Sequence, residues 1–349
     1  MNLLLRLFSI YSLLVFLRGA KSAAITPVPL YETTLGTATL LSFVVEYNQK
    51  SKRRKSMREI WEQLARLKIS TDKIEEIRSK DGVFVYRIFS EKNTYVLKYF
   101  EKVEHRREIE NYRLLKSLNI PTINVIGSTG SGLLLEDISQ SETHILGELA
   151  DLSDTETARL IAKWYKALHE KGYEHLKIRD VDLYAELDNL TMQNLEPIKT
   201  KTLTTGAPVW EKLEKNLDII VCKANSFPKT LTYNDFYYTN LIVAKNKTSA
   251  MMFDYNLLGK GYAYSDIRNV CYSLGDAAKA AFLDEYGTFD PLEKITDDVV
   301  SVLVTLIFAC RHKKIPPWAN GSLKKLHDGT LSEKIDVLLK TAAKGVKGI

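Results

Sequence analysis

The sequence predicts an α+β protein with two lobes, a small β-rich lobe that contains one helix and a larger, mainly helical lobe. Two observations predict this fold. Residues 73–100 alternate apolar and polar side chains in runs separated by residues 79–82 and 91–93, which is typical of strands joined by hairpin turns. After residue 140 the apolar residues recur mainly with helical spacing, as in Leu160, Ile161, Trp164, Tyr165 and Leu168.

The predicted elements follow one another in a simple order. A helix over residues 57–67 precedes the strands, and a helix over 103–118 follows them and ends before Pro121. Two short strands are expected over 124–126 and 132–138. In the second lobe we expect a helix over 154–172, with Asp154 as its N-cap and Gly172 just past its end. Further helices are expected over 181–194, 208–225, 264–285, 292–311 and 331–345.

Residues 1–56 are predicted to be an extension, separate from a first lobe over 57–140 and a second lobe over 141–349. Residues 1–17 are apolar around Arg6 and small residues follow them, which fits a secretory signal or a marginal membrane anchor. Arg53 and Arg54 can also be encoded as a ribosome-binding site translated in frame, two codons before Met57, and this would make Met57 the true start. An undistinguished N-terminal extension is the third alternative.

Composition excludes several classes of protein. Residues 1–56 hold eight of the 49 Lys and Arg and two of the 43 Asp and Glu, so the rest of the chain has 41 of each and is neutral. A neutral body gives no electrostatic footprint for nucleic acid. The three cysteines are far apart and form no CxxC pair, and the six histidines form no HExxH pair, so a disulfide framework and a zinc site are not expected.

Three polar residues form a spaced motif between apolar, β-leaning runs. Asn240 follows Asp235 by five residues, and Asp254 follows Asp235 by nineteen. This spacing is typical of a phosphoryl-transfer site, in which one Asp orients a hydroxyl group while an Asn and a second Asp hold Mg²⁺. The motif therefore predicts a reaction, with Asp235 as the catalytic base and Asn240 and Asp254 as metal ligands.

The first lobe offers residues that could hold the nucleotide. Lys98 interrupts an apolar strand, and Glu108 follows it by ten residues in the next helix. We expect Glu108 to fix the rotamer of Lys98, which would bind the α- and β-phosphates of ATP. The alternative is a lysine on the solvated face of an edge strand. Glu136 and Ile138 lie between the lobes, where the adenine edge would meet backbone N–H and C=O groups.

Motifs along residues 73–285 resemble the aminoglycoside phosphotransferase/choline kinase-like family, which has a protein-kinase-like fold. They are Val96-Leu-Lys-Tyr99, Leu133-Leu-Leu-Glu-Asp137, Ala167-Leu-His169, Asn234-Asp-Phe-Tyr-Tyr-Thr-Asn-Leu241, Phe253-Asp-Tyr255 and Ser265-Asp-Ile267. The resemblance implies a small-molecule kinase that uses ATP and Mg²⁺. It assigns Lys98, Glu108, Asp235, Asn240 and Asp254 the roles given above, and it implies that Asp266 braces the metal loop.

The chain departs from the family pattern beside the catalytic base. The family has His-Gly-Asp, whereas this chain has Tyr233-Asn234-Asp235, so we expect the loop to lose the brace that the His provides. The first-lobe nucleotide loop keeps a single glycine, Gly82. A protein kinase is disfavoured because no Ala-Pro-Glu follows Asp254. The alternative to an active enzyme is a catalytically weakened protein that binds a nucleotide or another ligand.

The expected partner is a small molecule with a hydroxyl group. The acidic residues 180–188 would suit a cationic acceptor, or they form a solvated helix face. His169 is interpreted as a packed residue at a helix end, and Tyr237 and Tyr238 either shape the acceptor pocket or pack. An enzyme that uses ATP is expected in the cytoplasm, with membrane tethering or export as the alternative if residues 1–24 are genuine. The oligomeric state carries no signature in the sequence.

Overall fold

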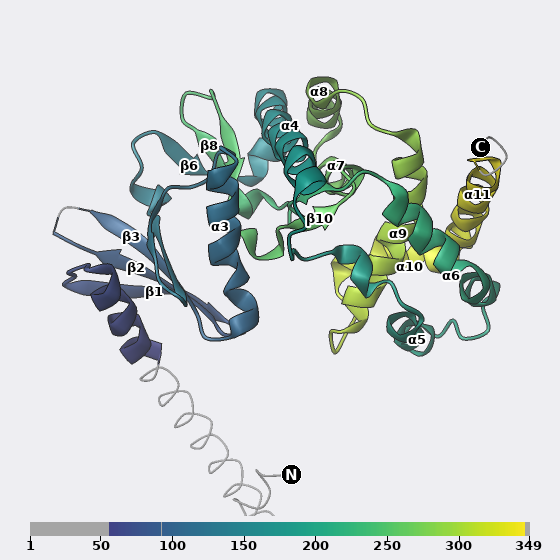
Figure 1. Ribbon diagram of the computed structural model, residues 1–349, viewed down its shortest axis with the longest axis horizontal. Coiled ribbons are helices and arrows are strands. Elements are labelled where there is room, and N and C mark those ends of the chain that lie inside the picture. The colour runs from purple at the N-terminus through teal and green to yellow at the C-terminus, as the bar shows by residue number, and fades with distance from the viewer. Residues whose placement is uncertain (1–55, 92, 346–349) are drawn as a thin grey trace, which may run out of the picture. The chain divides into compact units, whose positions relative to one another are not determined.

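The structure, a computed structural model, describes residues 56–91 and 93–345, with side chains as far as residue 341 (Figure 1). The chain divides into one unit of residues 1–59 and a second of residues 60–349, and the account below concerns the second unit. The predicted alternatives of a signal, a membrane anchor or an untranslated stretch before Met57 concern residues 1–56. All of these residues except Ser56 lie outside the described part of the chain. Within the described part of the chain, no helix has the length and apolar character needed to cross a membrane.

A five-stranded antiparallel sheet forms the β-rich part of this unit. Its strands lie in the order β1-β2-β3-β5-β4, so β3 is central. The turn between β1 and β2 has positive φ at Asp81 (53°) and Gly82 (89°), which is the turn that an Asp-Gly pair favours. The predicted strands are therefore present. Their bounds are β1 Lys73–Lys80, β2 Val83–Phe89, β3 Thr94–Phe100, β4 Val125–Ser128 and β5 Gly132–Glu136.

One helix, α3 (Arg107–Ser117), packs beside this sheet (Figure 1). Its buried residues Ile109, Tyr112 and Leu115 belong to the same apolar cluster as Leu133 and Leu135 of β5. The predicted helix over 103–118 is divided, because residues 103–105 form a 3₁₀ turn before α3 begins. Glu108 then lies in the first turn of α3.

Two small sheets in the second part carry the motif residues. Asp235 follows β7 (Thr230–Thr232), Asn240 immediately precedes β8 (Leu241–Ala244), and Asp254 follows β9 (Ala250–Met252). β8 lies between β6 (His144–Leu146) and β9, and β7 pairs with β10 (Gly259–Gly261). The strands are short and almost wholly buried, so the polar residues at their ends are held on a rigid support.

The helices of the second part differ from the prediction in several places. Residues 181–194 are mostly irregular, with a short 3₁₀ turn at Glu186–Asn189, and a helix over 192–201 lies mostly beyond that range. Residues 264–285 are broken at Gly275, and the helix over 320–327 was not expected. The acidic residues 180–188 therefore do not form a helix face. The helices are α4 Thr155–Ile178, α5 Met192–Lys201, α6 Pro208–Ser226, α7 Tyr264–Ser273, α8 Asp276–Tyr286, α9 Pro291–Cys310, α10 Asn320–His327 and α11 Thr330–Gly345.

Helix α4 does not end at Gly172, as the sequence suggested, but continues to Ile178. A Cβ at Gly172 would lie 2.5 Å from the backbone nitrogen of Leu231, so this glycine lets α4 approach β7 closely. Asp154 is the N-cap, as predicted, because its side chain accepts a hydrogen bond from the Glu156 N–H at 3.3 Å. The close contact of α4 with β7 fixes the strand that leads to Asp235.

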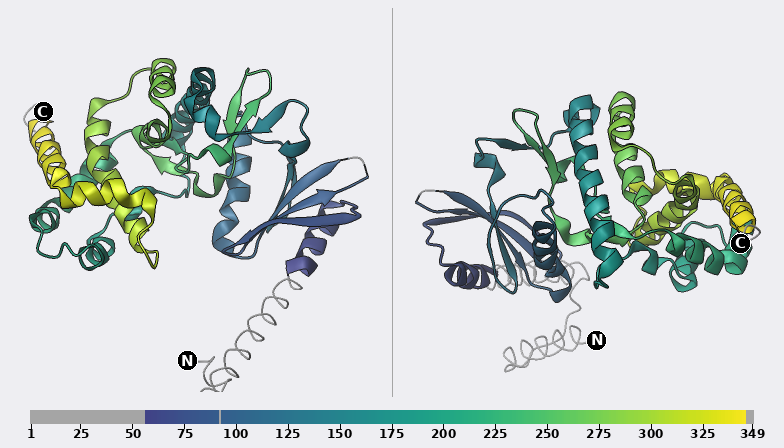
Figure 2. Two further views of the ribbon diagram at one scale, coloured as in Figure 1. Left: turned by 180° about the vertical axis from the view of Figure 1, so that it is seen from behind. Right: turned by 45° about the horizontal axis from the view of Figure 1, so that its top comes forward.

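Two apolar clusters hold the unit together. The first joins α3 and β5 to α4, β8, β9 and α8, and α4 and α8 lie side by side (Figure 2). The second lies among α5, α6, α9 and α11 and includes Trp210, Leu213, Leu303 and Ile335. Full burial of each such side chain contributes about 1.5–3 kcal/mol. The first cluster spans the β-rich and helical parts, so it supports the motif residues from both sides.

Candidate functional site

A cavity of about 410 Å³ brings four of the predicted site residues together. The β1–β2 hairpin, β3 and α3 form one side of it, and residues 239–240 and 253–256 form the other. Lys98, Glu108, Asn240 and Asp254 all line this cavity, although they come from four separate parts of the chain. Asp235 is not among its lining residues, but its side chain is bonded to Asn240.

Lys98 lies between two carboxylates. Its Nζ is 2.9 Å from Oε1 and 2.6 Å from Oε2 of Glu108, and 2.7 Å from Oδ1 of Asp254. The Lys98 residue is only 9% exposed, and β3 is the central strand, which excludes a lysine on a solvated edge. Burial lowers the pKa of Lys98, but attraction to Glu108 and Asp254 outweighs that effect, and the net shift is upward. Lys98 therefore remains a cation.

Local structure explains why Glu108 reaches this lysine. Glu108 lies in the first turn of α3, where the helix dipole favours a negative charge. It is fully buried, and burial raises its pKa to about 7, although Lys98 acts in the opposite direction. Glu108 and Lys98 thus form a buried hydrogen-bonded pair that faces the cavity beside the carboxylate of Asp254.

Asp235 and Asn240 are joined at the ends of β7 and β8. Asn240 Nδ2 donates to Oδ2 of Asp235 and to the Asp235 backbone oxygen, both at 3.2 Å. Burial, followed by repulsion from Asp254, raises the pKa of Asp235 to about 6, while Asn240 and Lys98 oppose the shift. At neutral pH Asp235 is therefore an ionised carboxylate with more basic character than an exposed aspartate.

Asp266 at the start of α7 holds the loop of Asp235. Its carboxylate accepts hydrogen bonds from the backbone N–H groups of Tyr233, at 2.7 Å, and Asn234, at 2.9 Å. The resemblance placed this brace on the metal loop, whereas in the structure it acts on the loop before Asp235. His169 is buried with Nε2 3.2 Å from Asp266 Oδ2 and Nδ1 2.7 Å from the Tyr286 hydroxyl, so it packs behind the loop.

Two residues missed as site residues by the sequence analysis also contact the segment around Asp254. The Tyr233 hydroxyl donates to the backbone oxygen of Phe253. Asn234 Nδ2 donates to the backbone oxygen of Leu257 at 3.0 Å. Their place beside Asp235 was visible in the sequence, but their partners lie about twenty residues away, where no local pattern indicates them.

The residues at the cavity fit a magnesium ion. The Asn240 amide nitrogen donates to Asp235, and Asp254 Oδ1 accepts from Lys98. Oδ1 of Asn240 and Oδ2 of Asp254 therefore remain as hard oxygen donors. Within the described residues, no group of three or more His, Cys, Asp or Glu side chains could hold a metal. A site with two protein oxygens suits Mg²⁺, which usually keeps waters and binds substrate phosphates.

Glu136 and Ile138 lie beside this cavity but do not line it. Glu136 ends β5, and its N–H donates to the Asn124 backbone oxygen at 3.0 Å. Ile138 begins a 3₁₀ turn and is 7% exposed, whereas the preceding strand residue Leu135 does line the cavity. Their contact with adenine stays a prediction.

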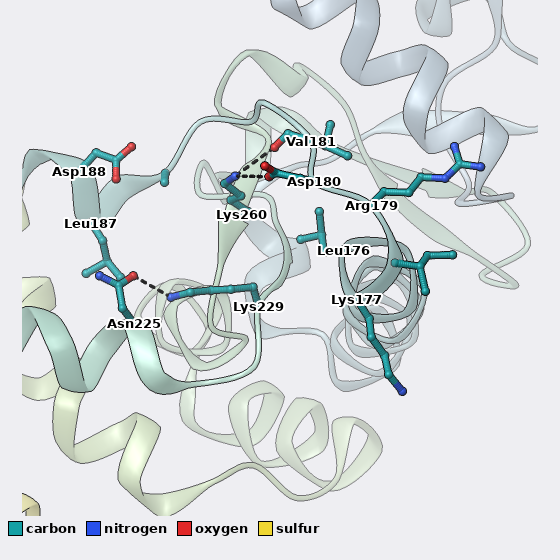
Figure 3. A pocket seen from close by; sticks show the side chains of 12 residues that line it. Leu176, Lys177, Arg179, Asp180, Val181, Leu187, Asp188, Asn225, Lys229 and Lys260 are labelled. Atoms are coloured by element: carbon teal, nitrogen blue, oxygen red, sulfur yellow. Dashed lines mark hydrogen bonds and ion pairs between the residues drawn. The ribbon is translucent and has the colours of Figure 1, made fainter.

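A separate cavity of about 750 Å³ contains none of the residues predicted to bind nucleotide or metal or to act in catalysis, but Asp180 and Asp188 of the acidic segment 180–188 line it. It lies at the end of α4, next to Asn225, Lys229 and Lys260 (Figure 3). Both lysines have partners there, because Lys229 Nζ donates to Asn225 Oδ1 at 3.2 Å and Lys260 Nζ to the Val181 oxygen at 3.0 Å. The Lys260 bond thus connects two segments that line this cavity, whereas the Lys229 bond stays within one segment.

The fold and the grouped side chains define a small-molecule phosphotransferase with a protein-kinase-like fold. Residues 74–293 match the phosphotransferase enzyme family (APH), and the chain belongs to this family. The family resemblance and the enzyme class that the sequence predicted are thereby confirmed.

Solved structures with the same fold include choline kinase LicA from Streptococcus pneumoniae, at 14% identity and a TM-score of 0.54, covering 80% of this chain and 99% of that chain. A choline/ethanolamine kinase family protein from Mesorhizobium loti has 11% identity and a TM-score of 0.55, covering 77% and 92%. Macrolide 2'-phosphotransferase MphH from Brachybacterium faecium has 14% identity and a TM-score of 0.52, covering 75% and 96%. Among curated proteins, none matches this chain by sequence.

Proposed function

We propose that this protein transfers the γ-phosphoryl group of ATP to a hydroxyl group of a small molecule in a Mg²⁺-dependent reaction. The observation that carries the proposal is the position of Lys98 Nζ between Glu108 and Asp254, in a cavity that Asn240 also lines. Residues 57–140 would form the nucleotide-binding lobe, and residues 141–349 would supply the catalytic loop and the acceptor pocket.

Lys98 would bind the phosphates of the nucleotide. Glu108 lies within 2.6 Å of its ammonium group and would keep it directed into the cavity when the nucleotide enters. Asn240 and Asp254 would hold Mg²⁺, which neutralises negative charge on the transferring phosphoryl group. Glu136 and Ile138 would border the adenine with backbone groups at the end of β5.

Asp235 would accept the proton of the attacking hydroxyl group. Its pKa of about 6 leaves it ionised at neutral pH and close to the value at which a general base is effective. The Asn240 amide holds the carboxylate at 3.2 Å, so its direction is fixed before the acceptor binds. Positioning of this kind supplies most of what phosphoryl transfer needs from a protein.

The acceptor would be an alcohol of the kinds that similar structures name, such as choline, ethanolamine or a macrolide. These proteins share the fold with this chain, and their acceptors differ, so the acceptor must be found by a screen. A cationic alcohol is favoured by acidic residues of the segment 180–188. Because the reaction consumes ATP, we propose a cytoplasmic location.

ATP consumption across a panel of amino alcohols, sugars, aminoglycosides and macrolides tests this function. We expect at least one acceptor to stimulate ADP formation by wild-type protein. Asp235→Asn should lower turnover by about 10²–10⁴-fold, the usual contribution of a general base. Asp218→Asn, at an exposed position of α6, is the matched control and should retain full turnover. Equal turnover in the Asp235 and Asp218 variants would refute the assigned base.

A thermal shift distinguishes an enzyme from a protein that only binds a ligand. Mg²⁺–ATP at about 100 times its Kd should stabilise the fold by about 2.7 kcal/mol. Stabilisation without ADP formation for any acceptor would favour the catalytically weakened protein. If Mg²⁺–ATP causes no stabilisation and no ADP forms with any acceptor, the protein does not use ATP and the proposed function is wrong.

A further inference from the structure

The hydroxyl group of Tyr233 ties the loop of Asp235 to the strand that leads to Asp254. Tyr233 is fully buried, and its ring packs against Trp164 and Tyr255, each with a centroid distance of 5.8 Å. The hydroxyl donates to the backbone oxygen of Phe253. Burial raises the pKa of this hydroxyl well above its ordinary value, so it stays a donor throughout the physiological range.

The peptide groups of Phe253 are held on both sides. The Phe253 N–H donates to the Asn240 backbone oxygen at 3.0 Å, and the Phe253 carbonyl accepts from Tyr233. The next residue is Asp254, whose backbone has φ +63° and ψ +69°. Because an aspartate adopts this left-handed conformation only at a cost, the bonds on the preceding peptide groups help to maintain it.

Asn234 makes a second connection between the same two segments. Its Nδ2 donates at 3.0 Å to the Leu257 backbone oxygen, three residues after Asp254, and at 3.0 Å to Thr232 Oγ1. Its φ is +65°, a conformation that glycine adopts freely and that asparagine tolerates better than most residues. A glycine at position 234 would adopt the positive φ without strain. Only the asparagine side chain can also donate the hydrogen bond to the Leu257 backbone oxygen.

We propose that Tyr233 and Asn234 are positioning residues that lock the segment of Asp254 onto the loop of Asp235. This inference rests on the proposed function, since Asp235 and Asp254 act there as base and metal ligand. Neither side chain would touch the substrates. Tyr233 and Asn234 stand where the family pattern has His-Gly, and they bond to the backbone oxygens of Phe253 and Leu257. The two segments therefore stay connected despite the departure from that pattern.

Single-group variants test the lock. Tyr233→Phe removes only the hydroxyl group, and Asn234→Gly removes the amide while it permits the positive φ. We expect each to lower kcat by about tenfold, which corresponds to the loss of one useful hydrogen bond, with little change in the acceptor KM. Each should also raise the Mg²⁺ concentration needed for half-maximal activity. The matched control is Tyr262→Phe, which loses a buried hydroxyl bond of 2.9 Å to Asp297 of α9 and leaves the bonds to Phe253 and Leu257 in place.

Amide hydrogen exchange supplies a readout that does not require turnover. Exchange at residues 253–258 should accelerate in Tyr233→Phe and Asn234→Gly but not in Tyr262→Phe, even though all three lose some stability. Unchanged exchange at these residues, or an unchanged kcat and Mg²⁺ requirement, would overturn the lock. If wild-type protein consumes no ATP with any acceptor, the proposed function fails, while the exchange data still decide whether the two segments are locked together.

Discussion

The ammonium group of Lys98 lies 2.7 Å from Oδ1 of Asp254, although 156 residues separate them in the sequence. Lys98 belongs to the central strand of the five-stranded sheet, and Asp254 follows a short strand of the second part. A second bond, from Asn111 Nδ2 to the Tyr255 oxygen at 2.7 Å, connects α3 to the same segment. The β-rich part and the segment of Asp254 are thus joined by polar contacts beside the cavity.

We expect Lys98→Met to impair both stability and nucleotide binding. The substitution leaves the carboxylates of Glu108 and Asp254 near each other with no cation between them, and breaking a buried pair in this way costs about 3–5 kcal/mol. Urea unfolding measures that loss, and the ATP dependence of turnover should show a higher KM. Lys215→Met is the control, because its pair with Glu211 is exposed to solvent, which screens the attraction, and should contribute little to stability. Equal stability of the two variants would contradict the buried pair.

Asp266 should matter for activity through the loop it holds. Asp266→Ala leaves the N–H groups of Tyr233 and Asn234 without their partner, and each buried unsatisfied donor costs about 1–3 kcal/mol. Asp266→Asn keeps one oxygen acceptor and should be less destabilised. Both variants should lower kcat more than the acceptor KM, measured by ADP formation at 20 °C below each variant's Tm. Full turnover in Asp266→Ala would show that Asp235 needs no such support.

The parts of the fold that the sequence predicted are those with strong local patterns. The alternation in β2 and β3, the Asp-Gly turn at residues 81–82 and the motif of Asp235, Asn240 and Asp254 all lie within short stretches. The contacts that complete the site link distant segments, such as Tyr233 with Phe253, and no local period reveals them. The expected loss of a brace was based on the missing histidine, and the Tyr233–Phe253 bond at the same place has no local sequence signature.

The prediction that α4 ends at Gly172 was wrong because the contact of Gly172 with Leu231 joins distant segments. This contact leads to a further prediction. Helix propensity alone predicts that Gly172→Ala stabilises α4 by about 1 kcal/mol. The added Cβ would instead lie 2.5 Å from the Leu231 nitrogen and 2.8 Å from Leu231 Cβ, so we expect destabilisation by about 1–3 kcal/mol. Chemical denaturation measures the sign. Gly321→Ala in α10 is the control, because its nearest atom would be the Tyr272 hydroxyl at 3.7 Å and the change should be neutral or stabilising.

Glu186 should make the stability of the protein depend on pH. Burial raises its pKa to about 7, and repulsion from Asp297 and Asp266 adds to the effect of burial while Arg268 opposes it. The folded state therefore binds the Glu186 proton more tightly than the unfolded state, whose pKa is near 4.5. The stability that this group contributes is fully present below pH 4.5 and is lost as the pH rises through 7.

Glu186→Gln removes that titration while it keeps the size of the side chain. We expect the variant to gain stability relative to wild type as the pH rises from 5 to 8, by up to about 3 kcal/mol, and the two proteins to be most alike at the acidic end. Urea unfolding at pH 5, 6, 7 and 8 measures the difference. Glu211→Gln on the exposed face of α6 should show no such gain with rising pH, because its pKa is lowered by Lys215. A constant difference between wild type and Glu186→Gln across this range would mean that Glu186 is ionised in the folded protein at every pH tested.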